Sequence, residues 1–225
     1  MPKTKATPQT KSKFRLEDHL LLAKFIANKL GITKVAEIKE FAEVKEGFDS
    51  DGRSYMYHAI IMRRGNTIPE GKLRQYDDNI RKYFDNLKRN REEKISLKYY
   101  QYLALLFSEI YLDSYFQNPI GFLNELNEWM SETTEQEFFS APDLKKIAYW
   151  MATGSGKTLI MHGNYWQFIA YNKGPKKLNF ENIMLITPSD EMSKQHLDDF
   201  KKKRNSSHNV SRRIHGILRR RQKRS

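Results

Sequence analysis

The stretch YWMATGSGKTLIMH at 149–162 constrains the fold of this chain more than any other. An apolar run at 144–151 leads into two glycines, Gly154 and Gly156, and helical periodicity then continues over 157–171. Glycine adopts the left-handed backbone conformations that a tight turn between two elements requires. We therefore predict a strand, a turn and a helix in this order, which is the start of a parallel α/β unit.

We call residues 152–158 the glycine loop, and its composition suits a phosphate group. Its end, Gly156-Lys157-Thr158, fits the phosphate-binding pattern G-x-x-x-x-G-K-[ST], although Met151 stands where the first glycine is expected. Backbone N–H groups of such a turn and the positive end of the following helix attract an anion. Lys157 would contact the β- and γ-phosphates, and the Thr158 hydroxyl would bind Mg²⁺. The alternative is a Gly/Ser turn that only begins an amphipathic helix.

A second strand and helix are expected after the loop helix. Residues 182–187 (NIMLIT) form a short apolar run that is typical of a buried strand, and Pro188 ends it. Residues 192–203 again have helical character. The order strand, loop, helix, strand, helix predicts the beginning of a doubly wound parallel sheet.

These residues resemble two motifs of the superfamily 2 (DEAD/DEAH-box) helicases. ATGSGKT at 152–158, preceded by Met151, is similar to motif I in the form found in helicase-like subunits of type I and type III restriction enzymes, where Met is ordinary at this place. LITPSDEMSKQHL at 185–197 is similar to motif Ia. The resemblance covers about 144–200 and implies a RecA-like lobe that binds ATP and Mg²⁺ and acts on DNA, with other restriction-modification subunits as further partners.

The resemblance also implies roles for individual residues. Motif I implies ATP binding by the glycine loop, with Mg²⁺ held through Thr158. Motif Ia implies contacts to the backbone of a double-stranded or tracked single-stranded DNA, with Ser193 and Gln195 as weaker candidates. The implied ATP-binding residues are Thr153, Gly154, Ser155, Gly156, Lys157 and Thr158, and the implied DNA-binding residues are Thr187, Pro188 and Ser189.

The same family suggests what to expect of two further positions. Some of these helicases bind adenine through a glutamine upstream of motif I, and Gln101 is a candidate, the alternative being an exposed polar position on a helix at 97–116. ATP hydrolysis requires an acidic pair at the end of a later strand. The one Asp-Glu dipeptide, Asp190-Glu191, lies inside motif Ia, and we interpret it as exposed acid at the start of a helix. We therefore assign no catalytic residue, and whether this chain is an enzyme stays open.

Composition and periodicity divide the chain into four parts. We expect a disordered leader at 1–13, a mainly helical region at 14–140, a partial P-loop helicase lobe at 141–203, and a basic tail at 204–225. The fold class is therefore α/β, with a helical N-terminal region followed by an incomplete P-loop (RecA-like) parallel-sheet lobe. Within the helical region, helices are predicted at 15–30, 34–46, 70–94, 97–116 and 118–130, whereas 54–64 fits either a strand or a helix.

The positive charge is concentrated at the C-terminal end. The chain has a formal net charge of +13, but residues 201–225 hold 11 of the 40 Lys and Arg residues and no acid. The remaining 29 basic and 27 acidic residues nearly balance. One interpretation is that the sequence beyond about 203 is read out of frame, so that the chain is the truncated front of a longer helicase. The other is a genuine basic arm that binds nucleic acid electrostatically.

Several function classes are disfavoured. The chain has no cysteine, hence no disulfide framework and no thiolate metal site, and it has no apolar run long enough for a membrane span. We expect a cytoplasmic protein without a membrane partner. The favoured function is the N-terminal part of an ATP-dependent DNA helicase or translocase of restriction type, inactive alone. The alternative is a non-enzymatic basic nucleic-acid-binding protein with a vestigial loop.

Overall fold

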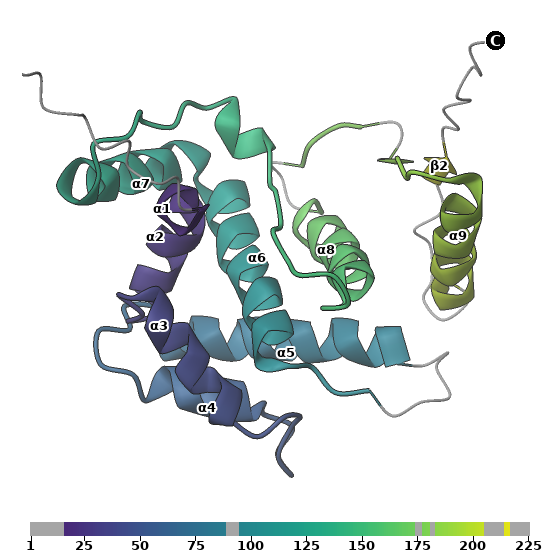
Figure 1. Ribbon diagram of the computed structural model, residues 1–225, viewed down its shortest axis with the longest axis horizontal. Coiled ribbons are helices and arrows are strands. Elements are labelled where there is room, and N and C mark those ends of the chain that lie inside the picture. Colours follow the sequence, from purple (N-terminus) through teal and green to yellow (C-terminus); the bar gives the residue numbers. More distant parts are fainter. Residues whose placement is uncertain (1–15, 89–94, 174–176, 181–182, 205–213, 217–225) are drawn as a thin grey trace, which may run out of the picture.

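The structure is a computed structural model that describes residues 16–88, 95–173, 177–180, 183–204 and 214–216 (Figure 1). The leader expected at 1–13 and nearly all of the basic tail expected at 204–225 lie outside these residues. The described chain is mostly helical, and α8 lies between the central helix α6 and the C-terminal helix α9 (Figure 1). None of the described helices is both long enough and apolar enough to cross a lipid bilayer.

Helices occupy the segments predicted from periodicity, although the first is interrupted at Leu20 and 34–46 forms a short α-helix followed by a 3₁₀ helix. Residues 89–94 of the helix predicted at 70–94 lie outside the described residues. The ambiguous segment at 54–64 contains a helix. Its N-terminus is capped by the Ser54 side chain, which accepts a hydrogen bond from the Tyr57 N–H group. The elements are α1 (Leu16–His19), α2 (Leu21–Lys29), α3 (Val35–Ile38), the 3₁₀ helix η1 (Lys39–Glu43), α4 (Tyr55–Ile61), α5 (Glu70–Lys88), α6 (Tyr99–Gln117) and α7 (Pro119–Thr133).

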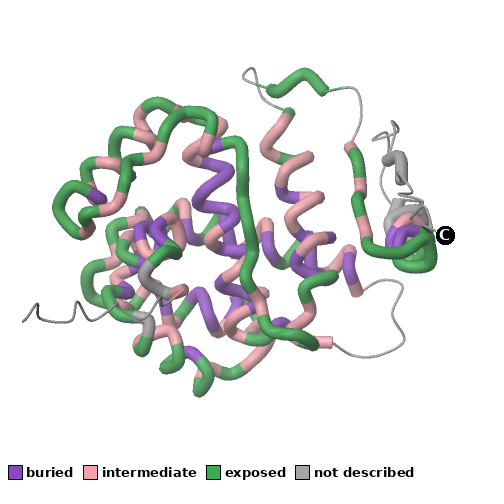
Figure 2. Tube along the Cα trace, turned by 45° about the horizontal axis from the view of Figure 1, so that its top comes forward, coloured by how far each residue is buried: buried purple, intermediate pink, exposed green. Residues whose placement is uncertain are grey.

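Helix α6 forms the centre of the core. It is apolar on nearly all sides, as expected of a helix surrounded by others. Helix α5, in contrast, buries a single stripe of residues spaced by three or four, and the rest of its surface is charged. Figure 2 shows the buried residues gathered on α6 and the helices around it. The side chains with almost no exposure include Ile26, Leu30, Ile60, Ile80, Phe84, Leu87, Leu105, Leu106, Leu126 and Met130.

The C-terminal part contains the short 3₁₀ helix η2 (Asp143–Lys145), α8 (Lys157–Tyr171), β1 (Ile183–Leu185), α9 (Asp190–Arg204) and β2 (Ile214–Gly216). Strands β1 and β2 pair in parallel, with Met184 opposite His215. Across the described residues this pair is the whole of the sheet. The predicted doubly wound sheet is therefore not formed by the described residues, because the partner of β1 comes from the expected basic tail and not from 144–151.

The strand predicted at 144–151 is not formed. After η2 the segment is extended but is not paired with β1 or β2. It is anchored to α6 instead, because the Tyr149 hydroxyl lies 2.6 Å from the Ser108 Oγ. A β-strand is stabilised by hydrogen bonds to a neighbouring strand, but this segment contacts a helix instead. Its apolar side chains remain accessible, with Trp150 78% exposed.

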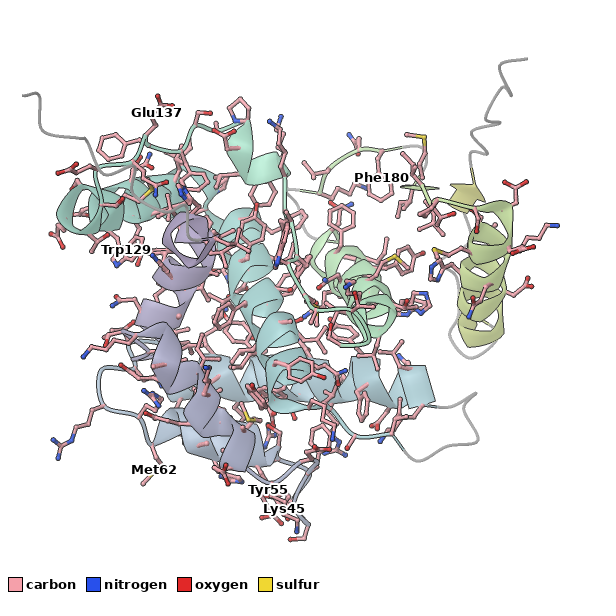
Figure 3. All side chains as sticks on the ribbon, in the orientation of Figure 1. Lys45, Tyr55, Met62, Trp129, Glu137 and Phe180 are labelled. Atoms are coloured by element: carbon pink, nitrogen blue, oxygen red, sulfur yellow. The ribbon has the colours of Figure 1, made fainter. Side chains whose placement is uncertain are left out.

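Aromatic side chains pack the connection after α8 against the helical core. Phe168 of α8 contacts both Phe116 of α6 and Phe180, with ring centroids 6.1 Å and 5.6 Å away. Phe180 is labelled beside α8 in Figure 3. Such tilted pairs add to the burial energy of the rings. Helix α8 is therefore packed on α6 near its C-terminal end.

Candidate functional site

The glycine loop has the backbone conformation that its sequence predicts. Gly154 and Gly156 have φ values of 77° and 85°, in the left-handed region that residues with a Cβ adopt at an energetic cost. Ser155 closes the turn, because its N–H group and its Oγ both donate to the Ala152 carbonyl at 3.3 Å and 2.7 Å. Gly156 is the N-cap of α8. The loop therefore passes directly into the start of the helix.

The start of α8 is open to an anion. The first N–H groups of a helix lack intrahelical acceptors, and no side chain caps this terminus. The first turn also contains no acidic residue. Since α8 has 15 residues, its aligned peptide dipoles place partial positive charge at this end. The backbone of Lys157 and Thr158 can thus donate to a phosphate oxygen.

The Lys157 side chain folds back over the glycine loop. Its Nζ donates to the Met151 carbonyl at 2.7 Å and to the Ala152 carbonyl at 2.8 Å. Both acceptors are uncharged, so these bonds hold the ammonium without cancelling its charge. The side chain is exposed. An anion at the start of α8 would therefore meet a positive charge that the loop itself has positioned.

The six residues implied to bind ATP form one continuous surface. Thr153, Gly154, Lys157 and Thr158 are exposed, and the two residues between them are half-buried. Thr158 lies in the first turn of α8, where its hydroxyl is accessible. Among the described residues no group of three or more His, Cys, Asp or Glu is placed to hold a metal ion. Mg²⁺ at Thr158 would thus take its other ligands from phosphate oxygens and water.

Gln101 lies against the glycine loop and is buried, so its interpretation as an exposed position on a helix is wrong. Only 8% of the residue is exposed. Its Nε2 donates to the Ser155 carbonyl at 2.9 Å, and its Oε1 accepts from the Lys98 N–H group at 3.0 Å. The first bond joins residues 54 positions apart in the sequence. Spacing within α6 gave no indication of it.

Helices α6 and α8 approach each other closely at Gly163. A Cβ atom added to this glycine would lie 2.6 Å from Cδ2 of Leu105, a distance that real Cβ contacts do not reach. One turn later, the Gln167 Nε2 donates to the Leu105 carbonyl at 2.9 Å. The absence of a side chain at 163 therefore sets how near the loop helix lies to α6.

A buried carboxylate, Glu109 of α6, joins α8 to α5. It accepts hydrogen bonds from Asn79 Nδ2 at 2.9 Å, Gln167 Nε2 at 2.7 Å and the Tyr171 hydroxyl at 2.8 Å. Burial raises the pKa of Glu109, because desolvation disfavours the charged form, and this outweighs the three donors, which lower it. Burial, followed by the charge of Glu109, raises the pKa of Tyr171 far above its usual range, so this hydroxyl stays a donor.

The motif Ia residues form the turn between β1 and α9. The Thr187 Oγ1 donates to the Ser189 carbonyl at 2.8 Å and lies 2.5 Å from the Ser193 Oγ. Pro188 and Ser189 are exposed, whereas Ser193 is buried and supports the turn from within. Gln195 is exposed. The turn thus presents two of the three implied DNA-binding residues to solvent.

Helix α9 packs on α8 through two imidazole rings. The rings of His162 and His196 are 5.5 Å apart between centroids and stand nearly perpendicular. Asp190 and Glu191 are exposed in the first turn of α9, where carboxylates are favoured by the helix dipole. Their exposure agrees with their interpretation as acids at the start of a helix.

The family of type III restriction enzyme res subunits matches residues 94–225, which is more than half of the chain. The chain belongs to this family. The resemblance seen in the sequence at about 144–200 is therefore confirmed, and the match extends it toward the N-terminus to include α6 and α7. Gln101 and Glu109 thus lie within the part shared with other res subunits. No curated protein and no solved structure matches this chain.

Proposed function

We propose that this chain provides the ATP-binding loop of an ATP-dependent DNA helicase or translocase of restriction type. One observation carries the proposal: two left-handed glycines, the uncapped start of α8 and the Lys157 ammonium converge on one exposed turn. Each feature favours an anion, and together they fit the β- and γ-phosphates of a nucleotide better than a single isolated charge. Membership in a helicase-like family supports ATP as the nucleotide.

The roles follow from the positions of the residues. The backbone of Gly154, Ser155 and Gly156 would surround the phosphates, and Lys157 would leave its two carbonyl acceptors to contact the β- and γ-oxygens. Thr153 would border the same turn. Thr158 would bind Mg²⁺, which when present offsets phosphate charge between the β- and γ-positions.

The DNA-binding and domain assignments are part of the same proposal. We assign backbone contacts to the turn at Thr187, Pro188 and Ser189, two residues of which are exposed at the N-terminal end of α9. Residues 141–203 would belong to a RecA-like lobe whose parallel sheet includes β1, and 14–140 would be the helical region that supports it. Other restriction-modification subunits are the expected protein partners.

Calorimetric titration with Mg²⁺ and ATP tests the nucleotide site. We expect Lys157→Ala to weaken binding by roughly tenfold to a hundredfold, because a hydrogen bond to a charged group contributes about 1.5–3 kcal/mol. Lys145→Ala, at an exposed lysine in η2, is the matched control and should bind as the wild type does. Equal affinity in wild type and Lys157→Ala would remove the support for the phosphate site.

Fluorescence anisotropy with labelled single- and double-stranded DNA tests the second half of the proposal. A helicase lobe should change its DNA affinity when Mg²⁺ and ATP are added, and Lys157→Ala should abolish that change. A basic module with a vestigial loop should bind DNA equally in wild type and Lys157→Ala, with or without Mg²⁺ and ATP. The second pattern would favour the non-enzymatic alternative.

A further inference from the structure

Gln101 connects the helical region to the backbone of the glycine loop. Its carboxamide extends from the first turn of α6 to the Ser155 carbonyl, and this hydrogen bond of 2.9 Å is partly buried. Breaking this bond would cost free energy, because the half-buried Ser155 carbonyl would lose its donor and water could replace that donor only in part. The position of this peptide group is therefore determined by α6 as well as by the loop itself.

The orientation of the Gln101 side chain is determined at both ends. Its Oε1 accepts from the Lys98 N–H group and its Nε2 donates to the Ser155 carbonyl. Rotating the amide by half a turn would bring two donors together at Lys98 and two acceptors together at Ser155. Each polar atom of the carboxamide thus already has a protein partner, so an adenine base would have to share the same two atoms.

The bond to Ser155 has a consequence for the next peptide N–H group. In a trans peptide the carbonyl oxygen and the following N–H point in opposite directions, and the described chain has no cis peptide. Holding the Ser155 carbonyl toward α6 therefore turns the Gly156 N–H away from α6, toward the open side of the loop. That side also carries the exposed start of α8 and Lys157.

Gly156 is needed for the contact itself. A Cβ added at this position would lie 2.5 Å from the Gln101 Nε2, which is closer than real Cβ contacts. The glycine is thus required twice, once for its φ of 85° and once for the approach of the Gln101 amide. The glycine in the loop and the glutamine in α6 form one fitted pair.

We propose that Gln101 is a positioning residue for phosphate binding: through the Ser155 carbonyl it presents the Gly156 N–H to the phosphates of any nucleotide, and it does not select adenine. This rests on the proposed function, since it concerns how the same loop binds. It differs from the adenine-reading role considered from the sequence. The two roles predict different affinities for ligands that lack adenine.

The test compares Mg²⁺ complexes of ATP, GTP and inorganic tripolyphosphate by calorimetry. The variant Gln101→Met keeps the length of the side chain and removes both polar atoms. We expect all three ligands to bind roughly tenfold more weakly, because each loses one well-directed backbone donor to a charged group. Gln117→Met, at an exposed glutamine at the other end of α6, should leave all three affinities unchanged.

A spectroscopic measurement separates positioning from a general loss of structure. In protein labelled with ¹⁵N-glycine, tripolyphosphate should shift the Gly156 amide resonance of the wild type, and this shift should be reduced in Gln101→Met. A resonance at Gly163, in the middle of α8, should keep its free-state position in the variant. That control establishes that the helix itself is intact.

The outcomes are distinct. If only ATP binding falls in Gln101→Met, Gln101 reads the base and the positioning role is overturned. If none of the three affinities changes while the wild type binds, the contact to Ser155 is irrelevant to binding, and the proposed function stands without it. If the wild type binds none of the three ligands, the proposed function fails, and the role of Gln101 fails with it.

Discussion

Replacing Glu109 by alanine should destabilise the protein, because Glu109 is the buried carboxylate that joins α8 to α5. The substitution removes the acceptor that Asn79, Gln167 and Tyr171 share. Gln167 keeps the Leu105 carbonyl, so two donors lose the acceptor that the structure gives them. Glu109 is fully buried, and the two donors, Asn79 and Tyr171, are half-buried, so the lost acceptor is replaced by water only in part.

The magnitude follows from the two donors that are left. An unsatisfied buried polar group costs about 1–3 kcal/mol, which gives roughly 2–6 kcal/mol for two. Relief from burying a carboxylate offsets part of this loss. We therefore expect Glu109→Ala to lower the free energy of unfolding by about 3 kcal/mol. Since urea slopes are about 1–3 kcal/mol per molar, the midpoint should fall by roughly 1–3 M.

Urea denaturation followed by circular dichroism measures this change. Glu132→Ala, at an exposed position of α7, is the matched control, and its midpoint should stay near that of the wild type. Hydrogen exchange adds a local readout, because amides in the C-terminal half of α8 should exchange faster in Glu109→Ala. Equal midpoints for the two variants would refute the reasoning, since they would show that the buried network contributes nothing net.

Two further perturbations test the same helix contacts. Burial raises the pKa of Glu109 above its ordinary 4.5, so the folded protein binds this proton more tightly than the unfolded chain does. The difference in free energy of unfolding between wild type and Glu109→Gln should therefore shrink as pH rises from about 4.5 through the folded pKa. Urea denaturation at several pH values measures this difference, and a constant or growing difference would contradict the prediction. Gly163→Ala should lower the free energy of unfolding by about 1 kcal/mol, because overpacking against Leu105 outweighs the gain in helix propensity. Gly71 has open space around it, so Gly71→Ala should be neutral or slightly stabilising. Thermal denaturation of both variants measures the difference.

The glycine loop and the helices around it could be predicted because their determinants are local. Two glycines before a Lys-Thr pair specify a left-handed turn and a helix start within a few residues. The Asn118-Pro119 pair likewise predicts the start of α7, and the Asn118 side chain caps it through the Gly121 N–H group. The family was recognisable for the same reason, since its motifs are short and contiguous.

The absence of the strand predicted at 144–151 and the contacts of Gln101 and Glu109 depend on residues far away in the sequence. Residues 144–151 have the composition of a buried strand. A strand forms only where it can pair with a neighbouring strand, and here Tyr149 is hydrogen-bonded to Ser108 of α6 instead. The burial of Glu109 was hidden because α6 is apolar on nearly all sides, so its pattern does not indicate which face is polar. The contact from Gln101 to Ser155 crosses 54 positions and has no local signature.

Binding phosphates well is not sufficient for hydrolysis, and we predict that the 225-residue chain does not release phosphate from ATP above background, with or without DNA. A loop that holds substrate and transition state equally gives no acceleration. The acceleration comes from groups that orient water and neutralise developing charge around the γ-phosphate. Within the described residues no carboxylate is hydrogen-bonded or ion-paired to the glycine loop.

A steady-state phosphate-release assay decides this, with Lys157→Ala as the background control. DNA-stimulated release that disappears in Lys157→Ala would contradict the prediction and would mean that an acid of this chain acts on the loop-bound nucleotide. Asp190 and Glu191 would then be the first residues to replace, because both are exposed in the first turn of α9, a helix that packs on α8 through His196. Loss of release in one of these variants, with ATP affinity retained, would identify the catalytic carboxylate, because binding depends on the loop and acceleration on the acid.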